Sequence, residues 1–525
     1  MQTNRCPINM ETANTIVSCR SSILSAMKSV PSFYVENFGC RATQADGAAI
    51  ERQFQERGLV RADASTEAEF VVLNTCTVTA AADQDARAAI RRINRANPQA
   101  RIIVTGCYAQ RVPQEIAALP GVAQVIGNSH KHELAGLALR SMKDLSCADD
   151  FSSGSGEEEA QSQIGDAHEL SPSFVRLASL SDNWELTTEN RISVSDIFAH
   201  TELLAAPVFE AANERTRPNL KVQDGCGNRC SFCVIPSVRG NSRSLPEDRI
   251  LQEVNALINA GYREVVISGI NLGRWGRDLP ATMVRRASCP SKVLLNDDSR
   301  PPRFEDLVCA ILEETTLEKL RISSVEPMDW SDELIHLMAS SPRIAKHAHV
   351  PMQSGSDAVL RRMHRKYRPW HYREKIEKIR AAMPSAAIGA DVMVGFPGES
   401  EAEFSETRRM VEELPFTYLH VFTYSARPGT PAAIMPDQVP ASVARERNRI
   451  LRELAAQKKL AFMRKFLGSG VEAITLNVNN GSFTESLTDN YLKLRLEGSH
   501  PANRWISATI KEVENGIMVG SLTNY

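Results

Sequence analysis

The sequence lacks the features of a membrane-spanning, secreted or strongly charged protein. No run reaches the roughly 18 consecutive apolar residues of a spanning helix, so we expect no membrane association. The first 31 residues contain no apolar core with a cleavage site, so we expect no signal peptide. Lys and Arg (61) nearly balance Asp and Glu (63). This balance excludes a nucleic-acid coat protein that acts through overall charge, but it allows a local basic face.

The sequence also lacks the dense cysteine pattern of a small disulfide-bonded scaffold. Its 11 cysteines are an odd number spread over 525 residues. Without an export signal we expect a cytoplasmic, reducing location, where clustered cysteines indicate metal binding or catalysis. The chain is long enough for about three or four domains of typical size.

Alternating strand and helix patterns predict an α/β fold class. Between residues 32 and 140, short β-rich runs alternate with helical stretches, which indicates a parallel sheet with helices on its faces. The alternation returns from Arg217 to about Thr430, where about six β/α units predict a partial TIM-type (β/α)6 barrel. Beyond Gly468, short β-rich runs predict a small C-terminal β domain.

Composition divides the chain into segments. They are a disordered extension (1–31), an N-terminal α/β domain (32–140), an acidic linker or insertion (141–216), a barrel (217–440), a connecting helix (441–467) and a β domain (468–525). The linker carries eight acids and one lysine between Ser141 and Leu170, which is typical of a solvated tether. Its weakly hydrophobic pieces Phe174–Leu180 and Ile192–Phe198 are expected to be strands along the barrel domain. Asp278–Pro302 is expected to be an insertion loop.

The most specific motif is Cys226-Gly-Asn-Arg-Cys230-Ser-Phe-Cys233. Its thiolates can reach one small inorganic cluster from a single loop, and thiolates suit both zinc and iron–sulfur clusters. Zinc usually has a fourth Cys or His ligand, and this loop offers none. A 4Fe-4S cluster on three cysteines keeps one iron open to another ligand. The motif follows the first predicted barrel strand, at the end of the barrel where active sites gather.

A second cysteine triplet lies in the N-terminal domain. Cys40, Cys76 and Cys107 each close a predicted strand (FYVENFGC, FVVLNTC and RIIVTGC) and each precedes a helix. In a parallel sheet all of them therefore lie at the carboxyl edge, where loops form a crevice. They predict a second cluster site. For this triplet taken alone, buried structural cysteines are the alternative.

The two triplets resemble a known family. CxxxCxxC with an aromatic residue before the last Cys resembles the signature of radical S-adenosylmethionine (SAM) enzymes. Its pairing with the upstream triplet and a C-terminal β domain resembles the methylthiotransferase family over about residues 32–140 and 217–525. Further motifs that carry the resemblance are Asn74-Thr-Cys76, Thr105-Gly-Cys107-Tyr-Ala-Gln110, Ser268-Gly-Ile-Asn-Leu-Gly273, Ser323-Ser-Val-Glu-Pro327, Pro351-Met-Gln-Ser-Gly-Ser356, Gly395-Phe-Pro-Gly-Glu399 and Tyr424-Ser-Ala-Arg-Pro-Gly-Thr430.

The resemblance implies two 4Fe-4S clusters and SAM as cofactors. It implies that Cys226, Cys230 and Cys233 hold the cluster that binds and cleaves SAM, yielding a radical that abstracts hydrogen from an unreactive carbon. It also implies that the upstream triplet, Cys40, Cys76 and Cys107, holds an auxiliary cluster that supplies or carries sulfur. An electron donor such as flavodoxin or ferredoxin is a further implied partner.

Residues at the ends of the predicted barrel strands are candidates for the SAM pocket. They are Gly269, Asn271, Glu326, Gln353, Gly395, Phe396 and Pro397. Glycine after a strand lets the backbone approach a ligand closely. Gly395–Pro397 is expected to present backbone and an apolar wall to the adenine, and Glu326 and Gln353 suit polar groups of the ribose or methionine. Ordinary turn chemistry is the alternative for each of them alone.

The substrate is predicted to be tRNA. The stretch Arg361–Arg380 holds nine Lys or Arg with Tyr367, Trp370 and Tyr372 interleaved, which predicts phosphate contacts and stacking on anticodon-loop bases. A solvated helix face is the alternative. The C-terminal domain, TRAM-like by resemblance, is nearly charge-balanced, so its net charge does not support RNA binding.

The motif wording HVFTYSARPGT and LRISSVEPMD most resembles one branch of the family. That branch adds a methylthio group to C2 of N6-threonylcarbamoyladenosine-37, in the anticodon stem-loop of tRNA. The alternatives are the branch acting on N6-isopentenyladenosine-37, the class acting on an aspartate of a ribosomal protein, and a non-catalytic iron–sulfur RNA-binding protein.

Overall fold

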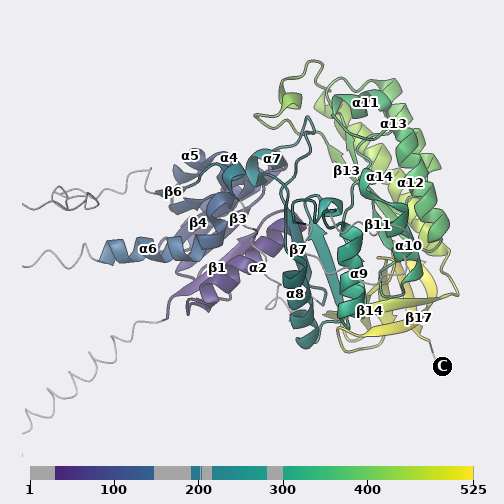
Figure 1. Cartoon of the computed structure of the whole chain (residues 1–525), viewed down its shortest axis with the longest axis horizontal. Helices are drawn as coiled ribbons and strands as arrows, with labels where there is room; N and C mark the ends of the chain where they lie inside the picture. The colour runs from purple at the N-terminus through teal and green to yellow at the C-terminus, as the bar shows by residue number, and fades with distance from the viewer. Residues whose placement is uncertain (1–29, 147–190, 201–202, 204–215, 281–299, 524–525) are drawn as a thin grey trace, which may run out of the picture.

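The computed structural model describes residues 30–146, 191–200, 203, 216–280 and 300–523 (Figure 1). The predicted disordered extension, most of the acidic linker with Phe174–Leu180, and most of the predicted loop Asp278–Pro302 lie outside these residues. In Figure 1 the N-terminal sheet domain lies on the left, the larger barrel in the centre and right, and the C-terminal strands at the lower right. The predicted fold class is confirmed.

The N-terminal domain is a parallel sheet in the order β2-β1-β3-β4-β5-β6. Its strands are β1 (Ser32–Asn37), β2 (Val60–Arg61), β3 (Phe70–Thr75), β4 (Arg101–Gly106), β5 (Val122–Ile126) and β6 (Ile192–Ser193). Its helices are α2 (Arg41–Gln55), α3 (Ala80–Ala96), α4 (Cys107–Arg111), α5 (Pro113–Ala117) and α6 (Leu134–Ser146), with the 3-10 helix η1 (Asn128–Glu133). Every residue of β3 is buried, because this central strand packs against apolar helix faces on both sides.

The prediction for Ile192–Phe198 is partly wrong. Its first residues form β6, which pairs in parallel with β5 and so completes the N-terminal sheet instead of lying along the barrel. The following 3-10 helix η4 (Ile197–Ala199) does lie against the barrel domain, next to Gly240. The edge of β5 offers unpaired backbone groups to any returning strand, which a local hydrophobic pattern does not reveal.

The central domain is the predicted partial barrel. Its parallel strands are β7 (Asn219–Asp224), β9 (Glu264–Gly269), β10 (Lys319–Ile322), β11 (His347–His349), β12 (Ala387–Val394) and β13 (Tyr418–Thr423). The short β8 (Arg243–Ser244) pairs antiparallel with β7. Isolated parallel bridges, Leu320–Ile344 and Ser324–His349, connect the β10 and β11 sides of the sheet. One apolar core fills the space between strands and outer helices.

Helices alternate with the barrel strands and cover the outside of the sheet (Figure 1). They are α7 (Ile235–Arg239), α8 (Glu247–Asn259), α9 (Phe304–Glu314), α10 (Asp332–Ser340), α11 (Asp357–Arg362), α12 (Pro369–Ala382) and α13 (Glu401–Glu413). Apart from α7, which leads from β7 to the antiparallel β8, these helices lie on connections to parallel strands, so the carboxyl ends of the parallel barrel strands open toward the same side.

The long helix α14 (Ala441–Arg464) connects the barrel to a closed five-stranded C-terminal barrel. The strand order is β14 (Gly470–Asn479), β15 (Phe483–Thr488), β16 (Lys493–Glu497), β18 (Ile517–Leu522) and β17 (Trp505–Glu514). Phe462 and Met463 of α14 pack into the core of this small barrel. The end of the helix is therefore part of the C-terminal core, while Leu451 in its middle packs in the core of the central barrel.

A buried network of charges joins the N-terminal domain to the central barrel. Asp46 on α2 accepts hydrogen bonds from Lys131 (3.0 Å), Arg239 (3.1 Å) and Lys221. Asp224 at the end of β7 accepts from Lys221 (2.8 Å) and Arg239 (2.9 Å). All of these side chains are buried. The network fixes α2, which begins directly after the first cysteine, relative to β7 and α7, which flank the CxxxCxxC motif.

Candidate active site

One cavity of about 550 Å³ lies between the N-terminal domain and the central barrel. Cys40 lines it from the N-terminal domain, and Ile235 lines it from the helix that follows the CxxxCxxC motif. Most of the remaining wall comes from β9 to β13 and the loops that follow them, and Tyr491 of the C-terminal barrel completes it. Its volume is in the usual range for cofactor and substrate sites.

The structure brings Cys40, Cys76 and Cys107 together at the carboxyl edge of the N-terminal sheet. Gly39 adopts a φ of 100°, and a β-carbon there would lie 2.8 Å from the sulfur of Cys76. Only glycine therefore allows the turn that holds Cys40 beside Cys76. Burial, and then the neighbouring thiols of Cys107 and Cys40, raise the pKa of Cys76 to about 11.

Cys107 also touches the barrel domain. It is buried against Val234 and Val238, and the side-chain amide of Asn128 lies 3.6 Å from its sulfur. The same amide donates a 2.7 Å hydrogen bond to the carbonyl of Val238. The N-terminal triplet therefore sits directly against the segment that follows Cys233.

The CxxxCxxC motif forms a loop after β7. The side-chain amide of Asn271 lies 3.6 Å from the sulfur of Cys226, and the Arg365 guanidinium lies 3.3 Å from the sulfur of Cys230. Burial raises the pKa of Cys233 to about 12.

Both triplets have the donor chemistry of a metal-cluster site. Each places three interacting thiols together: Cys76 and Cys107 are buried, the cysteines of the CxxxCxxC motif are partly buried, and Cys40 is exposed. Thiolates in such a place need positive charge nearby. Amide and guanidinium groups point at the sulfurs, as hydrogen-bond donors do around iron–sulfur clusters. Among the described residues, the group whose ligand atoms lie close enough to share one metal ion is His349, Asp391 and His420, which contains no cysteine, so neither triplet forms a ready zinc tetrahedron.

The structure divides the SAM-pocket candidates into two groups. Gly269, Asn271, Glu326 and Gln353 line the cavity. The carboxylate of Glu326 pairs with Arg365, the same residue that contacts Cys230. The backbone of Gln353 has a φ of 61°, and it pairs with both Asp391 and Met393 at the strand end.

The segment Gly395–Pro397 does not line this cavity. All of its residues are buried behind the cysteine loop, where the ring of Phe396 lies 6.4 Å from that of Phe232 in an edge-on contact. Gly395 packs against Ala444 of α14. The structure thus brings Phe396 to the motif itself and not to the open space, and a role in SAM binding stays a prediction for both groups.

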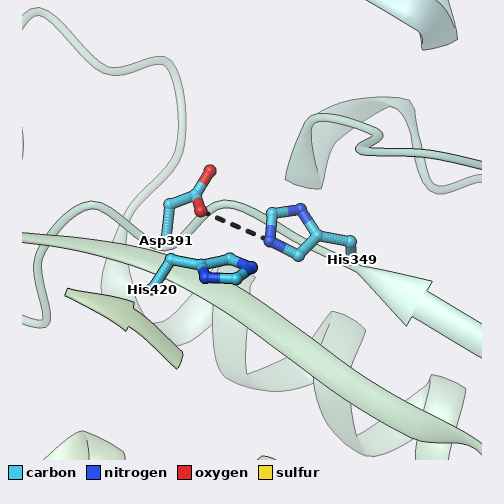
Figure 2. Close-up of side chains that lie close together, drawn as sticks. All are labelled: His349, Asp391 and His420. Carbon is cyan, nitrogen blue, oxygen red and sulfur yellow. Dashed lines mark ion pairs between the residues drawn. The ribbon is translucent and has the colours of Figure 1, made fainter. Parts of the chain in front are cut away.

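A cluster that the sequence analysis missed lies in the same cavity. His349 on β11, Asp391 on β12 and His420 on β13 point toward one another (Figure 2). His349 Nε2 lies 3.3 Å from Asp391 Oδ1, and His349 Nδ1 lies 2.6 Å from the hydroxyl of Ser324. Residues two positions apart on a strand lie on the same face of the sheet, and so do paired residues on neighbouring parallel strands. A correct prediction of how these strands pair would therefore have placed the three side chains together.

The predicted stacking surface in Arg361–Arg380 is wrong in two of its three aromatic residues. Tyr367 and Tyr372 are buried, and each donates a 2.7 Å hydrogen bond to a backbone carbonyl of the barrel, while only Trp370 is exposed. Several of its cations pair with acids, in Arg362–Glu403, Arg368–Asp357, Arg373–Glu413 and Lys378–Asp332. A helix that packs on a barrel must bury one face, and the aromatic residues occupy that face.

A different surface gathers more cations than acids. A second cavity, of about 520 Å³, lies between β13, α14 and the C-terminal barrel. We call it the basic groove; its charged lining is Arg217, Arg452, Lys459, Lys493, Arg495 and one acid, Glu485. Tyr418, His420 and Tyr491 line both cavities, so the groove adjoins the site. The cations come from several elements, so the charge balance of the C-terminal domain could not show them.

Within the described chain, no helix is both long and apolar enough to cross a membrane.

Two family models match the sequence. Residues 32–127 match "Uncharacterized protein family UPF0004", and residues 220–411 match the "Radical SAM superfamily". These matches cover the two domains that carry the cysteine triplets.

Curated relatives match over most of the chain. A threonylcarbamoyladenosine tRNA methylthiotransferase MtaB from Bacillus subtilis (strain 168) is 34% identical, over 88% of this chain and 89% of the relative. The protein of that name from Aquifex aeolicus is 32% identical, over 90% of this chain and 99% of the relative. A tRNA-2-methylthio-N(6)-dimethylallyladenosine synthase from Frankia alni is 31% identical, over 84% of this chain and 77% of the relative.

A solved structure shares the fold. The radical SAM methyltransferase TsrM from Kitasatospora setae, with tryptophan substrate and a SAM analogue bound, superposes with a TM-score of 0.50 at 13% identity. The match covers 77% of this chain and 75% of that one.

Proposed function

We infer the function of this chain from its family, because it belongs to the radical SAM methylthiotransferases. The chain is proposed to add a methylthio group to C2 of N6-threonylcarbamoyladenosine-37, beside the anticodon of tRNA. Relatives named for threonylcarbamoyladenosine are 29% to 34% identical over most of the chain. Relatives named for dimethylallyladenosine match over 77% of their own length, and that alternative is not favoured.

The observation that carries the proposal is that both cysteine triplets adjoin one cavity: Cys40 lines it, and Asn271, which also lines it, has its side-chain amide 3.6 Å from the sulfur of Cys226. SAM and 4Fe-4S clusters are the cofactors of the family. Cys226, Cys230 and Cys233 would hold a cluster that would supply the electron for reductive cleavage of SAM. Cys40, Cys76 and Cys107 would hold a second cluster, which would supply or carry the sulfur.

The chain's own residues bind and orient SAM and the target base in this proposal. Asn271 and Glu326 line the cavity at the cysteine loop, where they suit the amino and carboxylate groups of the methionine part. Gly269 lines the cavity at the end of β9, where a β-carbon would lie 2.9 Å from the side-chain oxygen of Gln223, so the packing of this strand end requires glycine. Arg365 holds the Glu326 carboxylate in place from behind.

The basic groove is the proposed path of the tRNA. Its cations suit the phosphates of the anticodon loop, and it adjoins the cavity through Tyr418, His420 and Tyr491. Aromatic rings at this junction suit a base that is turned out of the loop. An electron donor such as flavodoxin or ferredoxin is a further proposed partner, and a tRNA substrate fits the proposed cytoplasmic location.

Nucleoside mass spectrometry tests the proposed function. The anaerobically reconstituted chain is incubated with SAM, dithionite and tRNA that carries threonylcarbamoyladenosine-37. We expect 2-methylthio-N6-threonylcarbamoyladenosine and 5′-deoxyadenosine as products. The matched control is the same tRNA with unmodified adenosine-37, which should yield no methylthio nucleoside. Methylthiolation of isopentenyladenosine-37 alone would assign the chain to the other branch.

A further inference from the structure

The His349–Asp391–His420 cluster lies on the route from the basic groove into the cavity. His420 lines both spaces, while His349 and Asp391 line the inner cavity that also contains Cys40 and Asn271. Asp391 and His420 are direct partners across β12 and β13. A nucleotide that entered from the groove would therefore meet His420 first and the other two residues further inside.

The cluster is held in a fixed geometry. The ring of His349 is placed by Ser324 on one side and Asp391 on the other, at 2.6 Å and 3.3 Å. Tyr418 lies beneath both histidines, with ring centroids 6.0 Å from His349 and 5.3 Å from His420. A β-carbon at Gly389 would collide with the Tyr418 ring, so glycine is needed for this packing.

The same cluster has room for a further polar partner. His349 is 7% exposed, and its Nε2 atom makes no hydrogen bond within the described residues, although it faces the Asp391 carboxylate. A ligand that supplies the missing hydrogen bond to such a buried polar atom gains the most binding free energy. The ligand must offer both donors and acceptors, because a carboxylate and two imidazoles face it.

We propose that His349, Asp391 and His420 form the binding site for the N6 substituent of the target adenosine. The proposal rests on the proposed function and names the residues that select this substrate. A threonylcarbamoyl group has urea N–H donors and a hydroxyl for Asp391, and a carbonyl and a carboxylate for the imidazoles. An isopentenyl group would bury the same polar side chains without hydrogen bonds, which is the strongest basis for substrate rejection.

The test compares two substrates on the same full-length, reconstituted protein. They are identical anticodon stem-loops with threonylcarbamoyl or isopentenyl adenosine at position 37, and the measurement is kcat/KM for methylthiolation by mass spectrometry. The variants are His420→Phe, which keeps the ring but removes its hydrogen bonds, and Asp391→Asn, which removes the charge. His336→Phe, on an exposed face of α10, is the matched control.

We expect His420→Phe and Asp391→Asn to lower the preference for the threonylcarbamoyl substrate by about 10- to 100-fold, as for loss of a hydrogen bond to a charged group. The control should keep the wild-type preference. Misfolding lowers both rates together, so the ratio remains informative, and iron content reports whether the clusters are retained.

Two results would overturn the inference. One is an unchanged preference in both variants. The other is one equivalent of a divalent metal in the wild-type protein that is lost in His420→Phe, because two imidazoles and a carboxylate can also ligate a metal. The proposed function is judged separately, on the wild-type protein, by whether it methylthiolates the threonylcarbamoyl substrate.

Discussion

Arg365 connects the cysteine loop to the wall of the cavity that is proposed to bind SAM. Its guanidinium lies 3.3 Å from the sulfur of Cys230, pairs with Glu326 and lies 5.0 Å above the ring of Tyr367. The side chain is buried, so this cation is a fixed part of the site and not a surface charge. Charged hydrogen-bond donors to cluster sulfurs raise the reduction potential, because they stabilise the added electron.

Replacing Arg365 by Gln should therefore impair the electron-transfer part of the proposed reaction. We expect a lower reduction potential for the barrel cluster and a roughly 10- to 100-fold slower formation of 5′-deoxyadenosine. An anaerobic redox titration followed by electron paramagnetic resonance measures the first effect. Arg373→Gln, which removes a partly exposed cation paired with Glu413, is the control. Equal potentials in the two variants would show that Arg365 has no such role.

Single residues differ in how well the sequence predicts them. Cys40, Cys76 and Cys107 were predictable as a group, because each ends a parallel strand and such ends meet at one edge. Arg365 was assigned to an RNA-binding face, since a run of cations does not reveal which of them turns inward. His420 was missed because its partners lie on other strands, far away in sequence.

At the scale of elements, the two triplets are presented in different ways. The barrel triplet comes from one loop after β7, whereas the N-terminal triplet comes from the ends of β1, β3 and β4. Strand positions were predicted well, because continuous apolar runs identify buried parallel strands. The two-residue β6 was misplaced, since its pairing with β5 is a tertiary contact.

Iron content should separate the two triplets. The reconstituted wild-type chain should hold about eight irons, four for each three-cysteine site. Changing Cys226, Cys230 and Cys233 together to Ala should leave about four, measured by colorimetric iron analysis of the anaerobic protein. Stoichiometric zinc in the wild type, or full iron retention in the variant, would contradict the two-cluster proposal.

The roles of the two triplets should also be separable. A variant with Cys40, Cys76 and Cys107 changed to Ala keeps the barrel loop and the cavity residues of β9 and β10. We expect it to form 5′-deoxyadenosine but no methylthio nucleoside, both measured by mass spectrometry. The control is the barrel triple variant, which should form neither product. Methylthiolation at the wild-type rate by the N-terminal variant would refute the auxiliary-cluster assignment.

At the scale of the whole molecule, the buried charge network makes the domain interface specific. Independent folding of the two domains, which a long tether would suggest, does not fit an interface of buried ion pairs. Burial acts to raise the pKa of Asp46, but Lys131, Lys221 and Arg239 together lower it below its usual range. The stability that this carboxylate contributes is therefore complete above about pH 4, the ordinary aspartate value, and is lost as the pH falls below it.

Removing the Asp46 charge should destabilise the interface strongly. In Asp46→Asn, three buried cations lose a shared partner, and we expect a loss of about 3 to 5 kcal/mol in the free energy of unfolding. Urea denaturation of the anaerobic protein measures the change. Asp63→Asn, at an exposed position of the same domain, should change it by less than about 0.5 kcal/mol.

The position of β6 determines what happens when the backbone is cleaved between the two domains. The strand that completes the N-terminal sheet lies after residues 147–190, on the barrel side of that stretch. A protein cut within 147–190 should therefore remain a tight noncovalent complex, because each fragment contributes a strand or a charge that the other needs. The N-terminal fragment made alone should expose the edge of β5 and aggregate, and adding the barrel fragment during refolding should rescue it.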